Sequence, residues 1–257
     1  WWQILPLGPA GAGNSPYQCY SAFAGNPLFI SPEGLAEDGL LTNDDLSTAR
    51  LPSGNVNYGR VMRSKHRLLS AASARFRSLK RGRLIDAFSR FQSDERQWLD
   101  DYTLFAALCE AYKHTDWPRW PRPLARRDAA ALAAARSELR DVVDRYVFEQ
   151  FIFWRQLHRL RKTAQARGVG LIGDLPIFVS ADSADVWANP ELFELDGHLR
   201  PRAVAGVPPD LFSQFGQRWG NPLYRWDAHR AEGFSWWHRR IAKTLETQPQ
   251  VVTTATV

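Results

Sequence analysis

The 257-residue chain is long enough for one or two domains, and its 44% hydrophobic and 23% charged residues are ordinary for a globular protein. No apolar run approaches the ~20 residues of a membrane-spanning helix, so no membrane partner is expected. The formal net charge of +6 comes mostly from arginine, which suggests either an anionic partner or a compositional bias towards arginine, and the bias is favoured.

Cysteine and histidine usage points to a protein without disulfides or metal. The chain has only two cysteines, Cys19 and Cys109, and no signal peptide is recognisable, so a cytoplasmic location is expected. Its six histidines show no paired ligand spacing, and no metal or other cofactor is predicted. The first residue, Trp1, lies inside an apolar strand-like run, as in a chain that begins within a longer protein.

The first elements predicted along the chain are short. Residues 1–13 are predicted to form a strand followed by a Gly/Pro loop, and a polar, aromatic loop follows over 14–20. Residues 26–31 are predicted to be extended. A helix is predicted over 32–41, because a proline stands in its first turn and a glycine near its end.

Apolar residues recur at three- and four-residue spacing over 56–116, which predicts helices. The stretch 60–90 carries ten basic residues and one acidic residue, Asp86. It fits either a nucleic-acid surface or a solvated helix face. The helix face is favoured, because no nucleic-acid motif accompanies the charges. A proline-stiffened loop is predicted over 117–123.

A long amphipathic helix is predicted over 129–167, with Gly168 as its C-terminal cap. A short buried strand over 169–172 follows and leads to Asp174. A carboxylate at the carboxyl end of a strand is typical of sites in α/β folds. Such a group accepts hydrogen bonds from vicinal sugar hydroxyls. A turn-stabilising aspartate is an equally good interpretation.

Two Gly/Pro-rich segments are predicted as loops, one over 205–210 and the other over 216–224. The second combines Trp219 with the amides of Gln217 and Asn221, a mixture that suits a neutral polyhydroxylated ligand better than a phosphate. A purely structural loop packed on the core by its aromatic side chains fits the same residues.

Several motifs, in their order along the chain, are similar to those of 4-alpha-glucanotransferases of the amylomaltase or disproportionating-enzyme type. The resemblance covers residues 1–49 and 92–246, and the basic stretch between them matches less well. The motifs that carry it lie at 2–9, 14–18, 21–27, 98–102, 173–179, 182–187, 204–210 and 216–224.

This resemblance implies an α/β protein with an incomplete (β/α)8 TIM barrel of the alpha-amylase-like type and a helical insertion. The expected division is early barrel strands and loops over 1–55, the insertion over 56–128, the barrel continuation over 129–246 and a non-family tail over 247–257. A retaining enzyme is implied, one that transfers alpha-1,4-glucan segments between maltooligosaccharides. Starch- or glycogen-derived glucans would be substrates, glucose would be an acceptor, and neither a cofactor nor a nucleic acid would be involved.

The resemblance also assigns roles to residues. Asp174 would hydrogen-bond the donor sugar beside the cleaved bond, Tyr17 would contact the same sugar, and Trp219 would lie in the acceptor sites. Asp210 would belong to a mobile loop over the cleft. The implied substrate contacts are Ser15, Tyr17, Asp174, Asp210, Gln217, Trp219 and Asn221.

The sequence departs from the family pattern after residue 245. The family's nucleophile stands in an Arg-Ile-Asp-His-Phe-Arg-Gly segment, and the residues from Glu246 onwards do not match it. No catalytic residue is therefore assigned, because neither the nucleophile nor the acid/base has a counterpart in the sequence. Residues 1–257 alone are predicted to be inactive. The alternatives are a non-catalytic glucan-binding module and a basic protein associated with nucleic acid.

Overall fold

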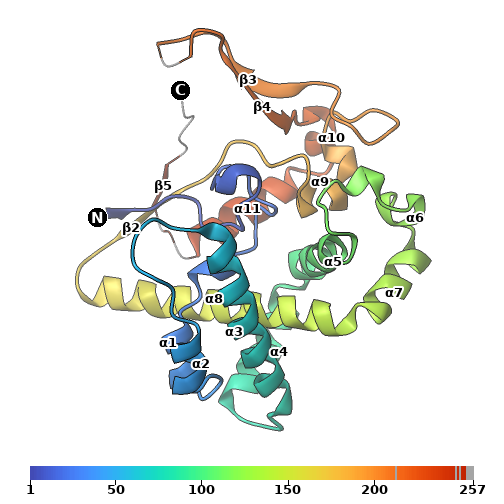
Figure 1. Ribbon diagram of the computed structural model, residues 1–257. Helices are drawn as coiled ribbons and strands as arrows, with labels where there is room; N and C mark the ends of the chain where they lie inside the picture. The colour runs from blue at the N-terminus through green and yellow to red at the C-terminus, as the bar shows by residue number, and fades with distance from the viewer. Residues whose placement is uncertain (212, 247, 249, 253–257) are drawn as a thin grey trace.

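Helices make up most of the computed structural model, which describes residues 1–211, 213–246, 248 and 250–252 (Figure 1). Short 3-10 turns occur at Ala12–Asn14, Pro27–Phe29, Trp117–Arg119 and Pro190–Leu192. The α-helices are α1 (Pro32–Glu37), α2 (Asn43–Thr48), α3 (Tyr58–Ser78), α4 (Arg83–Asp94), α5 (Arg96–Tyr112), α6 (Arg122–Ala125), α7 (Ala129–Glu138), α8 (Arg140–Ala166), α9 (Ala184–Ala188), α10 (Trp226–Ala231) and α11 (Ser235–Leu245).

Three short strands form a parallel sheet in the order β1-β2-β5. They are β1 (Trp2–Gln3), β2 (Leu171–Asp174) and β5 (Gln250–Val252). Parallel strands joined through helices are the α/β arrangement that the sequence predicts. The strands of the described residues do not close a barrel. The separation of residues 56–128 as an insertion stays a prediction.

The predicted long helix is two helices, so its single span over 129–167 is wrong. Leu139 leaves helical geometry, with φ −95° and ψ 18°, and separates α7 from α8. The break lets α7 pack on α5 and α6, while α8 continues under α3, α4 and α5. The predicted end is confirmed, because Gly168 directly follows the cap residue Arg167 and adopts φ +71°, a conformation that favours glycine.

Two elements near the N-terminus also differ from their predictions. The prediction of residues 26–31 as extended is wrong for Pro27–Phe29, although Asn26, Ile30 and Ser31 on either side do have extended backbone. Asn26 caps a 3-10 turn instead, with its side-chain oxygen 3.0 Å from the backbone nitrogen of Leu28. The predicted helix over 32–41 ends earlier, at Glu37, and the chain turns through Gly39 at φ +73°. Side-chain capping by Asn26 thus overrides the extended pattern in the first case, whereas in the second the helix ends just before the glycine that was expected near its end.

The aromatic side chains mostly fill the core. Trp117, Trp120, Trp187 and Trp236 are buried in one hydrophobic cluster, and a second cluster joins α1 and α3 to α8. The high tryptophan content therefore reflects packing more than an exposed ligand surface.

Several basic side chains of residues 60–90 are used within the molecule. Arg77 pairs with Asp141 at 2.8 Å, and Arg75 pairs with Asp45 at 2.7 Å. Lys65 donates to the carbonyl of Ile30. These contacts support the interpretation as a helix face. None of the helices in the described part of the chain has the length and apolar character needed to cross a membrane.

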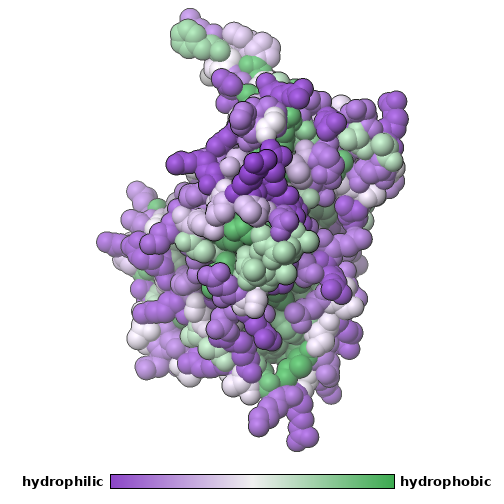
Figure 2. All heavy atoms as spheres, turned by 90° about the vertical axis from the view of Figure 1, so that its right-hand side faces the viewer, coloured by the Kyte–Doolittle hydropathy of each residue, from purple (hydrophilic) through white to green (hydrophobic). Residues whose placement is uncertain are grey.

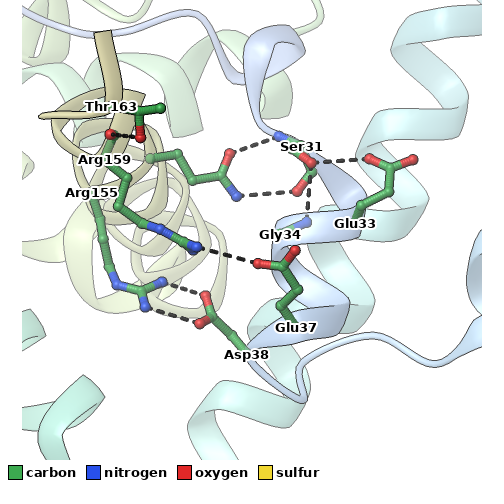
Figure 3. A network of polar contacts seen from close by, with 9 residues as sticks. Ser31, Glu33, Gly34, Glu37, Asp38, Arg155, Arg159 and Thr163 are labelled. Atoms are coloured by element: carbon green, nitrogen blue, oxygen red, sulfur yellow. Dashed lines mark hydrogen bonds and ion pairs between the residues drawn. The ribbon is translucent and has the colours of Figure 1, made fainter. Parts of the chain in front are cut away.

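Polar contacts fasten α1 to α8 (Figure 3). The guanidinium of Arg155 bonds both carboxylate oxygens of Asp38. The Gln156 amide bonds both backbone groups of Ser31, accepting from the nitrogen at 2.7 Å and donating to the oxygen at 3.1 Å. The start of α1 is thereby held to the helix that leads into β2.

Candidate functional site

Asp174 is the last residue of β2, at the carboxyl end of the parallel sheet, and is only 4% exposed. The Tyr17 hydroxyl donates a hydrogen bond of 2.7 Å to its Oδ2. Both side chains line a cavity of about 70 Å³. Because the carboxyl edge of a parallel sheet is where α/β proteins bind ligands, this pair marks the candidate site.

Ser15 supports the loop that carries Tyr17. Its hydroxyl oxygen accepts from the backbone nitrogen of Tyr17 at 3.3 Å, and its carbonyl accepts from the nitrogen of Gln18 at 3.2 Å. Ser15 does not line the cavity. In this structure it holds the turn beside the Tyr17–Asp174 pair.

The two predicted loops of the C-terminal part contain an antiparallel hairpin, so their prediction as loops is wrong in part. Its strands are β3 (Val204–Val207) and β4 (Gln217–Pro222). Gly206 is needed for close strand approach, because a Cβ there would lie 2.3 Å from the carbonyl oxygen of Gln217. The glycine that suggested a loop therefore serves a strand pair.

The hairpin presents an aromatic ring next to an amide. Trp219 is partly exposed, and its Nε1 donates to Oε1 of the exposed Gln217 at 3.1 Å. The ring of Phe178, from the segment after β2, lies 6.3 Å from the Trp219 ring, centroid to centroid. Trp219 thus packs beside the residues that follow Asp174.

Gln18 joins the first loop to this hairpin. Its Nε2 donates to the Trp219 carbonyl at 3.2 Å and to Asn221 Oδ1 at 3.0 Å. Asn221 is buried, and its own Nδ2 donates to the Val179 carbonyl at 2.8 Å. Gln18 is not among the site residues predicted from the sequence. Its partners Trp219 and Asn221 lie 201 and 203 positions further along the chain, so no local pattern connects them.

Side chains from beyond the hairpin hold the residues that directly follow β2. Arg240 donates to the Pro176 carbonyl, and the Tyr224 hydroxyl donates to the Ile177 carbonyl at 2.9 Å. The Asn221 side chain also donates a hydrogen bond to the Val179 carbonyl. Three backbone oxygens of this segment therefore accept from side chains. The segment after the strand-end carboxylate is therefore held by side chains of β4, of the residues after it and of α11.

A buried cation lines the same cavity as Tyr17 and Asp174. Arg240 is buried on α11, with its guanidinium 5.3 Å from the ring centroid of Trp236 and 5.0 Å from that of Trp237. Burial raises the pKa of nearby Asp185 to about 6, although the Arg240 charge and a hydrogen bond from the Ala22 nitrogen oppose the rise. The four-residue spacing of Trp236 and Arg240 places both on one face of α11, but no signal in the sequence indicates that the arginine is buried.

Asp210 lies in the connection between β3 and β4, outside the lining of the cavity. Its Oδ1 accepts from the backbone nitrogen of Ser213 at 2.7 Å. Leu211 and Phe215 in the same connection are fully or almost fully exposed, at 102% and 92%. Figure 2 shows this end of the molecule as a narrow projection with apolar atoms at its tip.

The structure thus brings most of the predicted residues into one neighbourhood. Tyr17 contacts Asp174, and Gln18 connects that loop to the strand that carries Trp219. These features define an α/β protein with a polar and aromatic site at the carboxyl edge of a parallel sheet.

The chain belongs to the 4-alpha-glucanotransferase family, whose profile matches residues 1–250. The 4-alpha-glucanotransferase of Thermus thermophilus is 49% identical over 246 residues, a match that covers 96% of this chain and 49% of that protein. The Aquifex aeolicus 4-alpha-glucanotransferase is 45% identical over 247 residues, covering 95% and 49%. The chain therefore spans about half the length of the curated relatives that it matches.

Solved structures agree with this assignment. Amylomaltase from Streptococcus agalactiae, in complex with acarbose, superposes with a TM-score of 0.92 at 37% identity, covering 99% of this chain and 51% of that one. Amylomaltase from Corynebacterium glutamicum gives a TM-score of 0.75 at 21% identity, covering 98% and 35%. The second likeness concerns the fold alone.

Proposed function

We propose that this chain forms part of the glucan cleft of a retaining 4-alpha-glucanotransferase, which moves alpha-1,4-glucan segments between maltooligosaccharides. Starch- or glycogen-derived glucans are the proposed donors, and glucose or a second glucan is the acceptor. The cytoplasmic location also remains a proposal; a relative from Solanum tuberosum is named chloroplastic/amyloplastic.

The observation that carries the proposal is the Tyr17–Asp174 hydrogen bond of 2.7 Å at the carboxyl end of β2. A buried carboxylate held on a strand accepts hydrogen bonds from the vicinal hydroxyls of a sugar ring without having to reorganise. We assign the donor sugar to this carboxylate, with Tyr17 beside it.

The hairpin is proposed to receive the acceptor. A retaining transfer forms a glycosyl-enzyme intermediate, and an acceptor hydroxyl must then compete with water for the anomeric carbon. The exposed face of Trp219 offers an apolar plate for a sugar ring, and Gln217 offers amide donors and acceptors. Asp210, in the connection between β3 and β4, is proposed to contact the substrate.

The two carboxylates of the retaining mechanism are not assigned to any residue of this chain. We therefore propose that residues 1–257 by themselves do not carry out transfer. A non-catalytic glucan-binding module is the second candidate. The exposed faces of Trp219 and Gln217 are compatible with it, because glucan binding needs only these surfaces.

A chimera tests the proposal. Residues 1–250 would replace the matching segment of the Thermus thermophilus relative. We expect the chimera to convert maltotriose into glucose and longer maltooligosaccharides, measured by chromatography, and residues 1–257 alone to give no products. The physical reason is that the relative supplies the carboxylates, while this chain supplies the sugar contacts.

The control is the same relative without its matching segment, which should be inactive. A folded chimera that binds maltoheptaose without turning it over would favour the binding module. Salt-sensitive binding of duplex DNA by residues 1–257, with no glucan binding, would instead favour the nucleic-acid alternative.

A further inference from the structure

Hydrogen bonds connect the two sides of the candidate cleft in a closed circuit. Tyr17 bonds Asp174, and its neighbour Gln18 bonds Asn221 in β4. Asn221 bonds the carbonyl of Val179, a residue that follows Asp174 along the chain. The strand-end carboxylate and the hairpin are thus joined by the first loop on one side and by the segment after β2 on the other.

Gln18 is the member of this circuit that reaches the hairpin from the first loop. Its Nε2 contacts both the Trp219 carbonyl, at 3.2 Å, and the Asn221 side chain, at 3.0 Å. The return contact from Asn221 Nδ2 to Gln18 Oε1 is longer, at 3.4 Å. The side-chain amides of Gln18 and Asn221 therefore face one another. The Gln18 amide also holds the backbone carbonyl of Trp219, whose ring is the aromatic plate.

We propose that Gln18 is a positioning residue that fixes the β3–β4 hairpin relative to Asp174. It sets where the Trp219 ring lies with respect to the donor-side carboxylate, without touching substrate itself. Asn221 completes this link from the hairpin side. This inference rests on the proposed function for its consequence in catalysis, but the structural part stands independently of any glucan.

The β3–β4 hairpin depends on contacts such as those of Gln18 to keep its place. A two-stranded hairpin has little stability by itself, and β3–β4 projects from the rest of the molecule (Figures 1 and 2). Without the Gln18 contacts, the Asn221–Val179 bond, the Phe178–Trp219 ring contact and backbone bonds at the base of the hairpin would still hold its start and end. We therefore expect a local loosening of the hairpin and no general loss of structure.

The test is hydrogen–deuterium exchange of the full chain with Gln18→Ala. Amides of peptides spanning 204–222 are expected to exchange about tenfold faster, whereas those of α8 keep their rates. Gln214→Ala, an exposed glutamine in the hairpin connection, is the matched control and should change neither region. Gln18→Glu, which keeps the size of the side chain but loses its donor, should loosen the hairpin in the same way.

Unchanged exchange over 204–222 in both Gln18 variants would overturn the proposal. So would an equal acceleration in α8, because that would make Gln18 a support of the whole fold. In the active chimera, Gln18→Ala should raise the KM for the glucose acceptor about tenfold and leave kcat within about twofold. If the chimera itself is inactive, the proposed function fails, while the exchange experiment still decides the positioning role.

Discussion

Replacing Asp174 by asparagine is expected to lower kcat/KM for glucan transfer in the chimera about 100-fold. Asparagine keeps the shape of the side chain and still offers an oxygen to the Tyr17 hydroxyl, so the local structure should be retained. What disappears is the negative charge, and a hydrogen bond to a charged group contributes up to about 3 kcal/mol. That amount corresponds to roughly two powers of ten in rate.

The matched control is Asp227→Asn, which removes an exposed carboxylate on α10. Its kcat/KM should stay within about twofold of the parent value. Tyr17→Phe should have an intermediate effect of about tenfold, because it removes one neutral donor from the carboxylate. An Asp174→Asn chimera as active as the control would show that the Asp174 carboxylate does not contribute to glucan transfer.

The largest effect on stability is expected for Gln150→Leu. Gln150 is 0% exposed on α8, and its amide bonds both backbone groups of Gly25. Leucine of similar size would leave a buried N–H and a buried carbonyl without partners, at about 1–3 kcal/mol each. Urea unfolding should therefore show a loss of about 2–6 kcal/mol in the free energy of unfolding.

Gln156→Leu is the natural comparison, because Gln156 holds Ser31 with the same pair of bonds six residues further along α8. Gln156 is only partly buried, so water can satisfy much of what the substitution exposes. Its cost should be less than half that of Gln150→Leu. An equal or larger cost at Gln156 would show that burial of the Gly25 backbone does not govern the effect.

Local signals in the sequence predicted the parts of the fold that depend on neighbouring residues. The cap at Gly168 and a strand leading to Asp174 follow from a helix stop signal and an apolar run, although β2 begins at Leu171, two residues later than predicted. The break at Leu139 has no such signal, since neither a glycine nor a proline occurs between residues 129 and 166. At the break the packing changes: α7 contacts α6 and α8 contacts α3 and α4, while both contact α5.

In the candidate site, too, the sequence predicts residues that stand in local motifs and does not predict contacts between distant segments. Tyr17, Asp174 and Trp219 were accessible to sequence reasoning, because each stands in a motif with a recognisable residue mixture. The contact between Gln18 and Asn221 joins positions 203 apart and could not be read from either segment. The hairpin was missed because Gly206 reads locally as a loop residue, and only the partner strand shows why it is needed.

Whether one glucan chain spans the first loop, the residues after β2 and the hairpin can be measured directly by hydrogen exchange of the chimera with and without acarbose, the ligand named with the Streptococcus agalactiae structure. Acarbose is expected to slow exchange in peptides covering 14–20, 174–179 and 217–222 together, and Asp174→Asn is expected to weaken the protection in all three. Protection confined to one of these segments, or found only in helices far from β2, would contradict it.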